Sequence, residues 1–159
     1  MSNFVRISIL ITVSLLSGCK KAEQPMPDAQ RAAVEETVKS LTEQSIAACE
    51  KVDIDGVAVN VSDKYNTGFI DNGVFYPSFE SLIADFRIGF GRLKSQEIKI
   101  SDRRITVLAP NVALVTAHGN FTATDKTNNT FKGNFAWTFV YAKIGDEWKI
   151  IHSHQSSPG

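Results

Sequence analysis

The C-terminal part of the chain is a series of four long segments in which apolar and polar residues alternate. Turn-forming residues separate these segments, which cover residues 96–108, 112–124, 130–144 and 147–156. Because alternate side chains of a strand point to opposite faces, the pattern predicts four long strands. Their close spacing along the chain predicts antiparallel neighbours joined by short turns. The preceding part of the chain therefore has to cover one face of this sheet.

A long amphipathic helix is predicted over residues 28–51, with Asp28 as its N-cap. The positions of its core-facing stripe recur every three or four residues; they are Ala33, Val34, Val38, Leu41, Ser45, Ile46 and Cys49. Since Cys49 falls on this stripe, we expect a buried thiol that packs as a small hydrophobic side chain, not a nucleophile. A weaker helical pattern covers residues 53–65, with a break near Gly56.

A short hairpin is predicted over residues 67–76, because an Asn72-Gly73 pair between apolar runs is a strong signal for a tight turn. Ser78 then caps a third helix. A capping box would need glutamate or glutamine three residues later, and Ser81 stands there instead, so we expect a simple cap. Helices followed by long antiparallel strands predict an α+β fold, with the helices packed on one face of a strongly curved sheet.

The first nineteen residues differ in character from the rest of the chain. Arg6 supplies a positive charge, and residues 7–16 form an apolar run about half as long as the ~20 residues of a membrane-spanning helix. This is the arrangement of an exported precursor. The tetrapeptide Leu16-Ser17-Gly18-Cys19 resembles the lipobox of bacterial lipoproteins, in which the cysteine receives a lipid. The alternative is an ordinary secretory signal that contains a cysteine by chance.

The resemblance to a lipobox implies cleavage after Gly18 and acyl lipid, such as palmitate, on Cys19. In such lipoproteins an aspartate after the cysteine favours the inner membrane. Lys20 stands at that position, so we expect attachment to the outer membrane, facing the periplasm, in a Gram-negative organism. The chain is thus divided into a signal peptide (residues 1–18), a polar tether (19–28) and a folded domain (29–157).

Charge and composition exclude several classes of function. Lysine and arginine total 17, as do aspartate and glutamate, so no basic patch supports nucleic-acid binding. Two cysteines are too few for a disulfide framework. Spacings that hold metals, such as Cys-x-x-Cys or His-Glu-x-x-His, do not occur. We expect no nucleic-acid partner, no metal and no cofactor.

The end of the chain carries a resemblance to a known family. An aromatic strand, Phe135–Tyr141, is followed by a strand that runs from Trp148 to the His152-Ser153-His154 triplet. With the preceding elements, this ending resembles the SnoaL-like branch of the nuclear-transport-factor-2-like superfamily and the association domain of calmodulin-dependent kinases. The resemblance covers residues 31–156. It implies a cone, the cystatin-like roll, with a pocket at one end and a homodimer formed through the outer face of the sheet.

Six residues are the candidates for contact with a ligand in this pocket: His152, His154, Trp148, His118, Tyr65 and Arg103. His152 and His154 have the same parity as Trp148 and Ile150, so we expect all four on one face. A neutral imidazole suits general acid–base work. The alternative is that these histidines hydrogen-bond helix ends or a partner subunit. Arg103 and its neighbour Arg104 point to opposite faces, so either one of them enters the pocket and binds an anion or both serve solubility.

The chain also contains residues of the types that enzymes of the superfamily use for catalysis, but their positions do not match the catalytic patterns of those enzymes. Asp71, Asp85, Tyr65 and Tyr76 are of the types that ketosteroid-isomerase relatives use, and dehydratase relatives use a His–Asp pair. Neither arrangement can be aligned onto this chain. The aromatic positions of the third long strand are predicted to form sheet core or dimer interface, not a ligand site; they are Phe131, Phe135, Trp137, Phe139 and Tyr141.

Three functions are compatible with these observations. The favoured hypothesis is a lipid-anchored, homodimeric domain that binds a small molecule or a protein partner without catalysis. The second is an isomerase, dehydratase or hydrolase that uses a pocket histidine with a carboxylate. The third is a module that serves only homo-oligomeric assembly. A fold of this kind does not decide among them, because function depends on the site.

Overall fold

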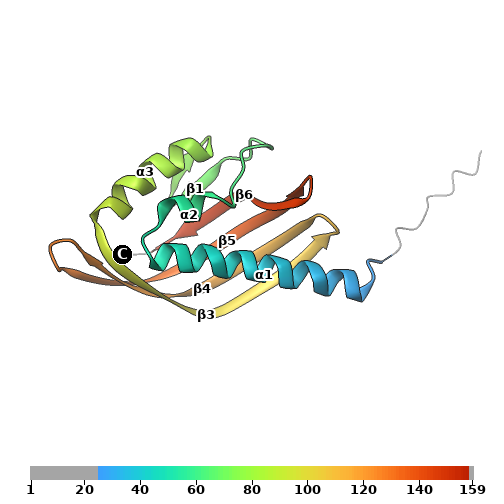
Figure 1. Cartoon of the computed structure of the whole chain (residues 1–159), viewed down its shortest axis with the longest axis horizontal. Coiled ribbons are helices and arrows are strands. Elements are labelled where there is room, and N and C mark those ends of the chain that lie inside the picture. Colours follow the sequence, from blue (N-terminus) through green and yellow to red (C-terminus); the bar gives the residue numbers. More distant parts are fainter. Residues whose placement is uncertain (1–24, 158–159) are drawn as a thin grey trace, which may run out of the picture.

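A curved six-stranded sheet forms the body of the protein, and the helices lie on its inner face (Figure 1). The computed structural model describes residues 25–157. The strand order is β2-β1-β6-β5-β4-β3. The strands are β1 (Phe69–Asp71), β2 (Val74–Tyr76), β3 (Leu93–Ala109), β4 (Val112–Asp125), β5 (Thr130–Ile144) and β6 (Glu147–Ser156). The predicted α+β cone with four long strands is confirmed.

The sheet departs from a purely antiparallel arrangement at one place. Strand β1 runs parallel to β6, with Ile70 opposite His154 and Asp71 opposite Gln155, whereas the other neighbours are antiparallel. The parallel pairing follows from the long connection through α3 and four strands, β2 to β5, which returns the chain to β1 in the same direction. It brings the short hairpin against the C-terminal strand.

Three helices cover the concave side: α1 (Asp28–Glu50), α2 (Ile54–Ala58) and α3 (Phe79–Arg92). Asp28 is the first residue of α1, and Pro27 is the N-cap, without a side-chain cap. The prediction of Asp28 as cap was therefore wrong by one residue: Pro27 has an extended ψ of 138°, and Asp28 is already helical. Asp53 caps α2 by accepting a hydrogen bond from the Gly56 backbone N–H.

The β1–β2 hairpin and the start of α3 confirm the turn signals and refine the cap. Asn72 and Gly73 both have positive φ, 47° and 80°, as a two-residue hairpin turn requires. Ser78 caps α3, and the Ser81 hydroxyl accepts from the Ser78 backbone N–H at 3.4 Å. A capping box is thus present after all, because a serine hydroxyl can do what glutamate usually does.

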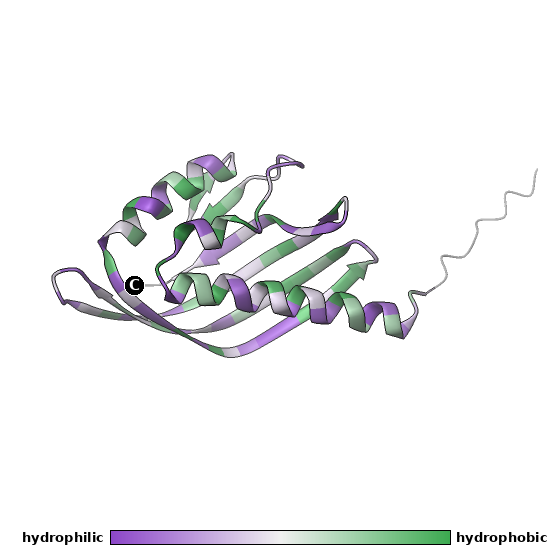
Figure 2. Ribbon diagram, in the orientation of Figure 1, coloured by the Kyte–Doolittle hydropathy of each residue, from purple (hydrophilic) through white to green (hydrophobic). Residues whose placement is uncertain are grey.

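The core lies between α1 and the middle of the sheet. Val38 of α1 and Tyr141 of β5 are completely buried. The Tyr141 hydroxyl lies 3.1 Å from Oγ1 of Thr42, which is also buried. Figure 2 shows hydrophobic and hydrophilic residues interleaved along the strands, as one buried and one exposed face demand. The remaining buried members of this cluster are Val34, Val107, Ala113, Val115 and Ile150.

A β-bulge interrupts the alternation of β6. Tyr141 pairs with Ile150 and the preceding Val140 pairs with His152, so Ile151 is an extra residue with no partner of its own. A bulge of this kind shifts the side-chain parity of the strand that carries it. Buried positions accordingly fall three residues apart, at Ile150 and Ser153.

The predicted leader and lipidation site, including Gly18 and Cys19, lie outside the described residues. Within residues 25–157 there is no helix of sufficient length and apolar character to cross a membrane.

Candidate ligand cavity

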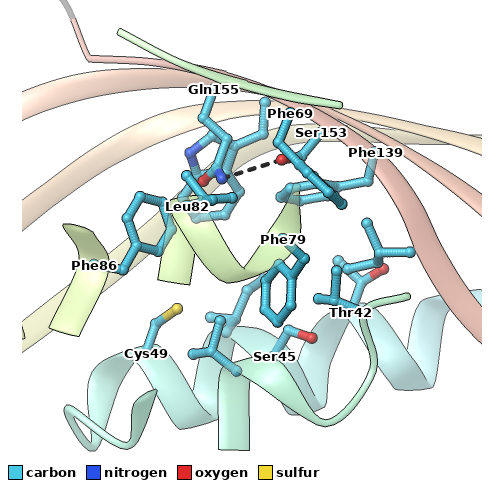
Figure 3. Close-up of a pocket in the computed structure, with 15 residues that line it drawn as sticks. Thr42, Ser45, Cys49, Phe69, Phe79, Leu82, Phe86, Phe139, Ser153 and Gln155 are labelled. Atoms are coloured by element: carbon cyan, nitrogen blue, oxygen red, sulfur yellow. Dashed lines mark hydrogen bonds between the residues drawn. The ribbon is translucent and has the colours of Figure 1, made fainter. Parts of the chain in front are cut away.

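A cavity opens between the helices and the half of the sheet formed by β1, β5 and β6 (Figure 3). Its volume is about 70 Å³. Fifteen residues line it: Thr42, Ser45, Ile46, Cys49, Val57, Val61, Phe69, Phe79, Leu82, Phe86, Trp137, Phe139, Ile150, Ser153 and Gln155.

Aromatic rings form much of the wall. The ring centroids of Phe69 and Phe79 are 5.7 Å apart and tilted, and those of Trp137 and Phe139 are 5.9 Å apart. Tilted contacts between aromatic rings at such distances are favourable. Phe86 closes the same space from the next turns of α3 (Figure 3). The wall is therefore apolar and largely preformed, as small-molecule sites usually are.

The hydroxyl groups on the α1 side are already engaged. Oγ1 of Thr42 donates to the backbone carbonyl of Val38 at 2.8 Å, so it accepts the bond from Tyr141. Oγ of Ser45 donates to the carbonyl of Leu41 at 3.1 Å. Both serine and threonine commonly bond the preceding turn in this way within helices. On this side the cavity behaves as an apolar surface.

The Cys49 thiol also faces the cavity from α1 (Figure 3). It keeps some accessible surface because it borders the empty space, yet burial raises the pKa of the thiol to about 12. The nearby Glu50 carboxylate adds to this increase in pKa. A thiol with such a pKa stays protonated at neutral pH and is inert as a nucleophile, so Cys49 behaves as a hydrophobic side chain, as predicted, but it lines the cavity and is only partly buried.

Two polar side chains enter from β6. Ser153 lies opposite Phe139, and Gln155 lies opposite Trp137, on the inner face of the sheet. Nε2 of Gln155 donates to Oγ of Ser153 across 3.5 Å (Figure 3). Ser153 is only 3% exposed. Unlike the hydroxyls of Thr42 and Ser45, the polar groups of these two side chains are not hydrogen-bonded to helix backbone.

None of the fifteen lining residues is a histidine, an aspartate or a glutamate. The one ionisable lining group is the Cys49 thiol, which is neutral at physiological pH because of its raised pKa. Proton transfer in a cavity requires a group with a pKa near the working pH within hydrogen-bond reach. The lining itself is therefore neutral at physiological pH.

The bulge at Ile151 places the C-terminal histidines on the outer face, away from the cavity. His152 Nδ1 lies 2.8 Å from the Gly68 carbonyl oxygen, and His154 is exposed next to Ile70. The expectation that both share a face with Ile150 was wrong, because the extra residue reverses their parity. His118 is exposed in the middle of β4 and also faces outward.

The other three candidates lie at separate places. Trp148 packs against the core cluster, and Tyr65 is 51% exposed in the loop before β1. Arg103 points inward and pairs with Glu43 of α1 at 2.9 Å, whereas Arg104 points outward. This ion pair lowers the pKa of Glu43. The structure does not bring the six predicted residues together, and a role for them in ligand binding stays a prediction.

A carboxylate cluster lies beside the cavity. The Tyr76 hydroxyl donates to Oδ2 of Asp85 at 2.7 Å, and this bond raises the pKa of Tyr76 to about 12. Half-buried Asp71 has a raised pKa because of burial, and the Asp85 charge adds to it. Of these residues, Asp71 has a lining residue as its register partner, Gln155 of β6. None of these three residues lines the cavity.

Several lining residues were missed from sequence. Trp137 and Phe139 were predicted to be core or dimer interface, while Phe135 and Tyr141 of the same stripe are indeed buried. Trp137 and Phe139 line the cavity together with residues of α1, α2, α3, β1 and β6. No local pattern in the sequence distinguishes these two environments.

Comparison with known proteins agrees with the fold. The SnoaL-like domain matches residues 38–159, and the chain belongs to this family. A nuclear transport factor 2-like superfamily protein from Salmonella enterica serovar Typhimurium superposes with a TM-score of 0.72 at 19% identity, covering 81% of this chain and 94% of that one. No curated protein matches the sequence.

Two further solved structures illustrate the range of the fold. A hexachlorocyclohexane dehydrochlorinase (LinA type 2) has a TM-score of 0.69 at 12% identity, covering 84% of this chain and 90% of the other. A Xanthomonas campestris protein, provisionally assigned as a calcium/calmodulin dependent protein kinase II association domain, has a TM-score of 0.66 at 22% identity, covering 77% and 86%. At such identities the likeness establishes the fold alone.

Proposed function

We propose that this protein is a lipid-anchored domain of the bacterial cell envelope that binds a small, mainly apolar molecule without catalysis. The family includes ligand-binding and isomerase or dehydratase members, so the choice depends on this chain's own cavity. The observation that carries the proposal is an apolar, aromatic-walled cavity whose lining has no histidine or carboxylate.

The energetics of the cavity support a binding role. Apolar surface gains roughly 25 cal/mol per Å² when it leaves water, and rings already fixed by their neighbours lose little entropy when a ligand enters. Catalysis of the isomerase or dehydratase type would need a base against the substrate, and the imidazoles lie on the opposite face of the sheet. This arrangement argues against the enzyme alternative.

Native mass spectrometry of the full-length protein purified from its own host tests the proposal. We expect a retained small molecule, released on denaturation, with a mass that fits a cavity of this size. The matched variant is Phe79→Trp, which adds atoms to the cavity wall and should lower the retained amount. A protein that carries nothing, and that also binds no apolar probe in vitro, would contradict the binding role.

The anchor is the second part of the proposal. The resemblance of residues 16–19 to a lipobox supports cleavage before Cys19 and lipid on that residue, and Lys20 supports sorting to the outer membrane. The change Cys19→Ser should release the protein from the membrane fraction or leave an uncleaved precursor. Membrane fractionation with lipid labelling measures this, and wild-type labelling of the variant would refute the anchor. Cys49→Ser is the control and should keep the lipid.

We also propose a homodimer formed through the outer face of the sheet. In the described part of the chain no helix covers this face (Figure 1), and it carries Val140, Leu114 and the three histidines. Sedimentation of the wild type should give a dimer, and Val140→Lys should give a folded monomer because a charge at the centre of a buried interface is unfavourable. If the wild type is a monomer at micromolar concentration, the proposed homodimer is excluded.

A further inference from the structure

We propose that Ser153 and Gln155 make the cavity selective for apolar molecules that carry one neutral hydroxyl group. The inference rests on the proposed binding function and specifies the chemistry of the ligand. It derives from the hydrogen-bonding capacity that these two side chains leave unused inside an otherwise apolar wall.

Ser153 has a donor without an acceptor. Its side chain is 3% exposed, and its hydroxyl oxygen accepts the long bond from Gln155 Nε2. The hydrogen bonds among residues 25–157 include none in which the Ser153 hydroxyl is the donor; its recorded bond is the one that its oxygen accepts from Gln155. Buried polar groups normally have partners, so this unpaired donor at the cavity wall points to a ligand acceptor.

Gln155 provides the complementary group. Its amide nitrogen is turned towards Ser153, which leaves the carbonyl oxygen without a donor from the described residues (Figure 3). A serine donor and an amide acceptor side by side match a hydroxyl group, which accepts one hydrogen bond and donates another. A ketone or ether oxygen can only accept a hydrogen bond, so it could bond to the serine but not to the amide oxygen. A hydrocarbon could bond to neither side chain.

Charge near the polar end excludes an anionic ligand. Asp71 is the register partner of Gln155 across β1 and β6, so the backbones of the two residues are one strand spacing, about 5 Å, apart. A second carboxylate, Asp85, lies close enough to act on Asp71. None of the lining residues carries a positive charge that could offset them. A carboxylate ligand would therefore lose its hydration and meet repulsion.

Three one-ring probes that differ in a single substituent test the inference: toluene, 4-methylphenol and 4-methylbenzoate. Calorimetric titration of the full-length protein in detergent at pH 7 gives the affinities. We expect 4-methylphenol to bind at least as tightly as toluene, although its hydroxyl gives up more hydration, and 4-methylbenzoate to show no binding. Ser153→Ala and Gln155→Leu should each weaken 4-methylphenol about threefold to tenfold and leave toluene within about twofold.

Ser156→Ala is the matched control, because Ser156 follows on the same strand with its hydroxyl directed to the Ala136 carbonyl on the far side. It should change neither affinity. Binding of toluene combined with an unchanged 4-methylphenol affinity in both cavity variants would refute the hydroxyl selectivity and leave the binding function standing. Failure of all three probes to bind would overturn both. Thermal melting of each variant confirms that it is folded.

Discussion

Filling the cavity should stabilise the protein and abolish ligand binding at the same time. Ser45 of α1 lines the cavity, and its hydroxyl is directed back to the helix backbone rather than to a ligand. The change Ser45→Leu adds apolar atoms to the empty space. Both consequences follow from the same geometry, because the atoms that fill the void occupy the volume a ligand would need.

The expected gain in the free energy of unfolding follows from the cavity volume. Cavities in protein cores cost about 24 cal/mol per Å³, so a volume of about 70 Å³ corresponds to about 1.7 kcal/mol of recoverable stability. The added carbons give a similar figure at about 0.8 kcal/mol per buried CH₂. For a domain of this size we expect a melting temperature roughly 4–8 °C higher. The affinity for 4-methylphenol should fall by at least about tenfold.

The control separates cavity filling from helix propensity. Ser40→Leu makes the same substitution in the same helix at an exposed position, so it gains the propensity of leucine without filling the void. Thermal and urea unfolding of both variants, with titration of the probe, measures the difference. If Ser45→Leu is no more stable than Ser40→Leu, or still binds the probe at wild-type affinity, the cavity is not the empty, ligand-accessible space described above.

Four more predictions concern neighbouring groups. Thr42→Val should destabilise by about 1–3 kcal/mol because it strands the buried Tyr141 hydroxyl, and Tyr141→Phe by only about 1 kcal/mol; equal losses in urea unfolding would contradict this. Val52→Gly should stabilise by about 1 kcal/mol, since Val52 has a φ of 56°, and a lower melting temperature would be the adverse result. Asp71→Asn should stabilise slightly at pH 7, by well under 1 kcal/mol at this half-exposed site. The folded-state pKa of Asp71 is raised by burial, so the wild type loses stability as pH rises through that pKa, and the advantage of the variant should vanish below about pH 4; a constant advantage across this range would refute the cause. Cys49, with a pKa of about 12, should react with iodoacetamide at pH 8 on the order of 10³-fold more slowly than a free thiol, and peptide mass spectrometry showing a free-thiol rate would contradict its burial.

Much of the fold could be predicted from the sequence because its signals are local. The strands Thr130–Ile144 and Glu147–Ser156 have the predicted bounds, since Gly145 and its neighbour form a turn that ends one strand and starts the next. Alternation and the Asn72-Gly73 pair likewise depend on near neighbours. The family resemblance then supplied the cone, which periodicity alone does not give.

The candidate site could not be predicted to the same degree, because it depends on contacts between distant segments. Phe69 and Phe79 meet only when the hairpin has folded under α3. The direction of Ser153 depends on a bulge whose trace in the sequence is weak: the adjacent apolar residues Ile150 and Ile151, which strict alternation would not contain. Counting parity through this pair assigned the histidines to the wrong face.

The bulge in β6 also governs how residue roles can be transferred between relatives. After Ile151 the inner positions are odd-numbered, whereas before it they are even-numbered. A relative without this extra residue would present a different set of side chains to its cavity, although an ungapped alignment of the strand would pair the same positions. Catalytic or binding residues on the last strand of a relative therefore correspond to residues of this chain only when both strands are counted from the bulge.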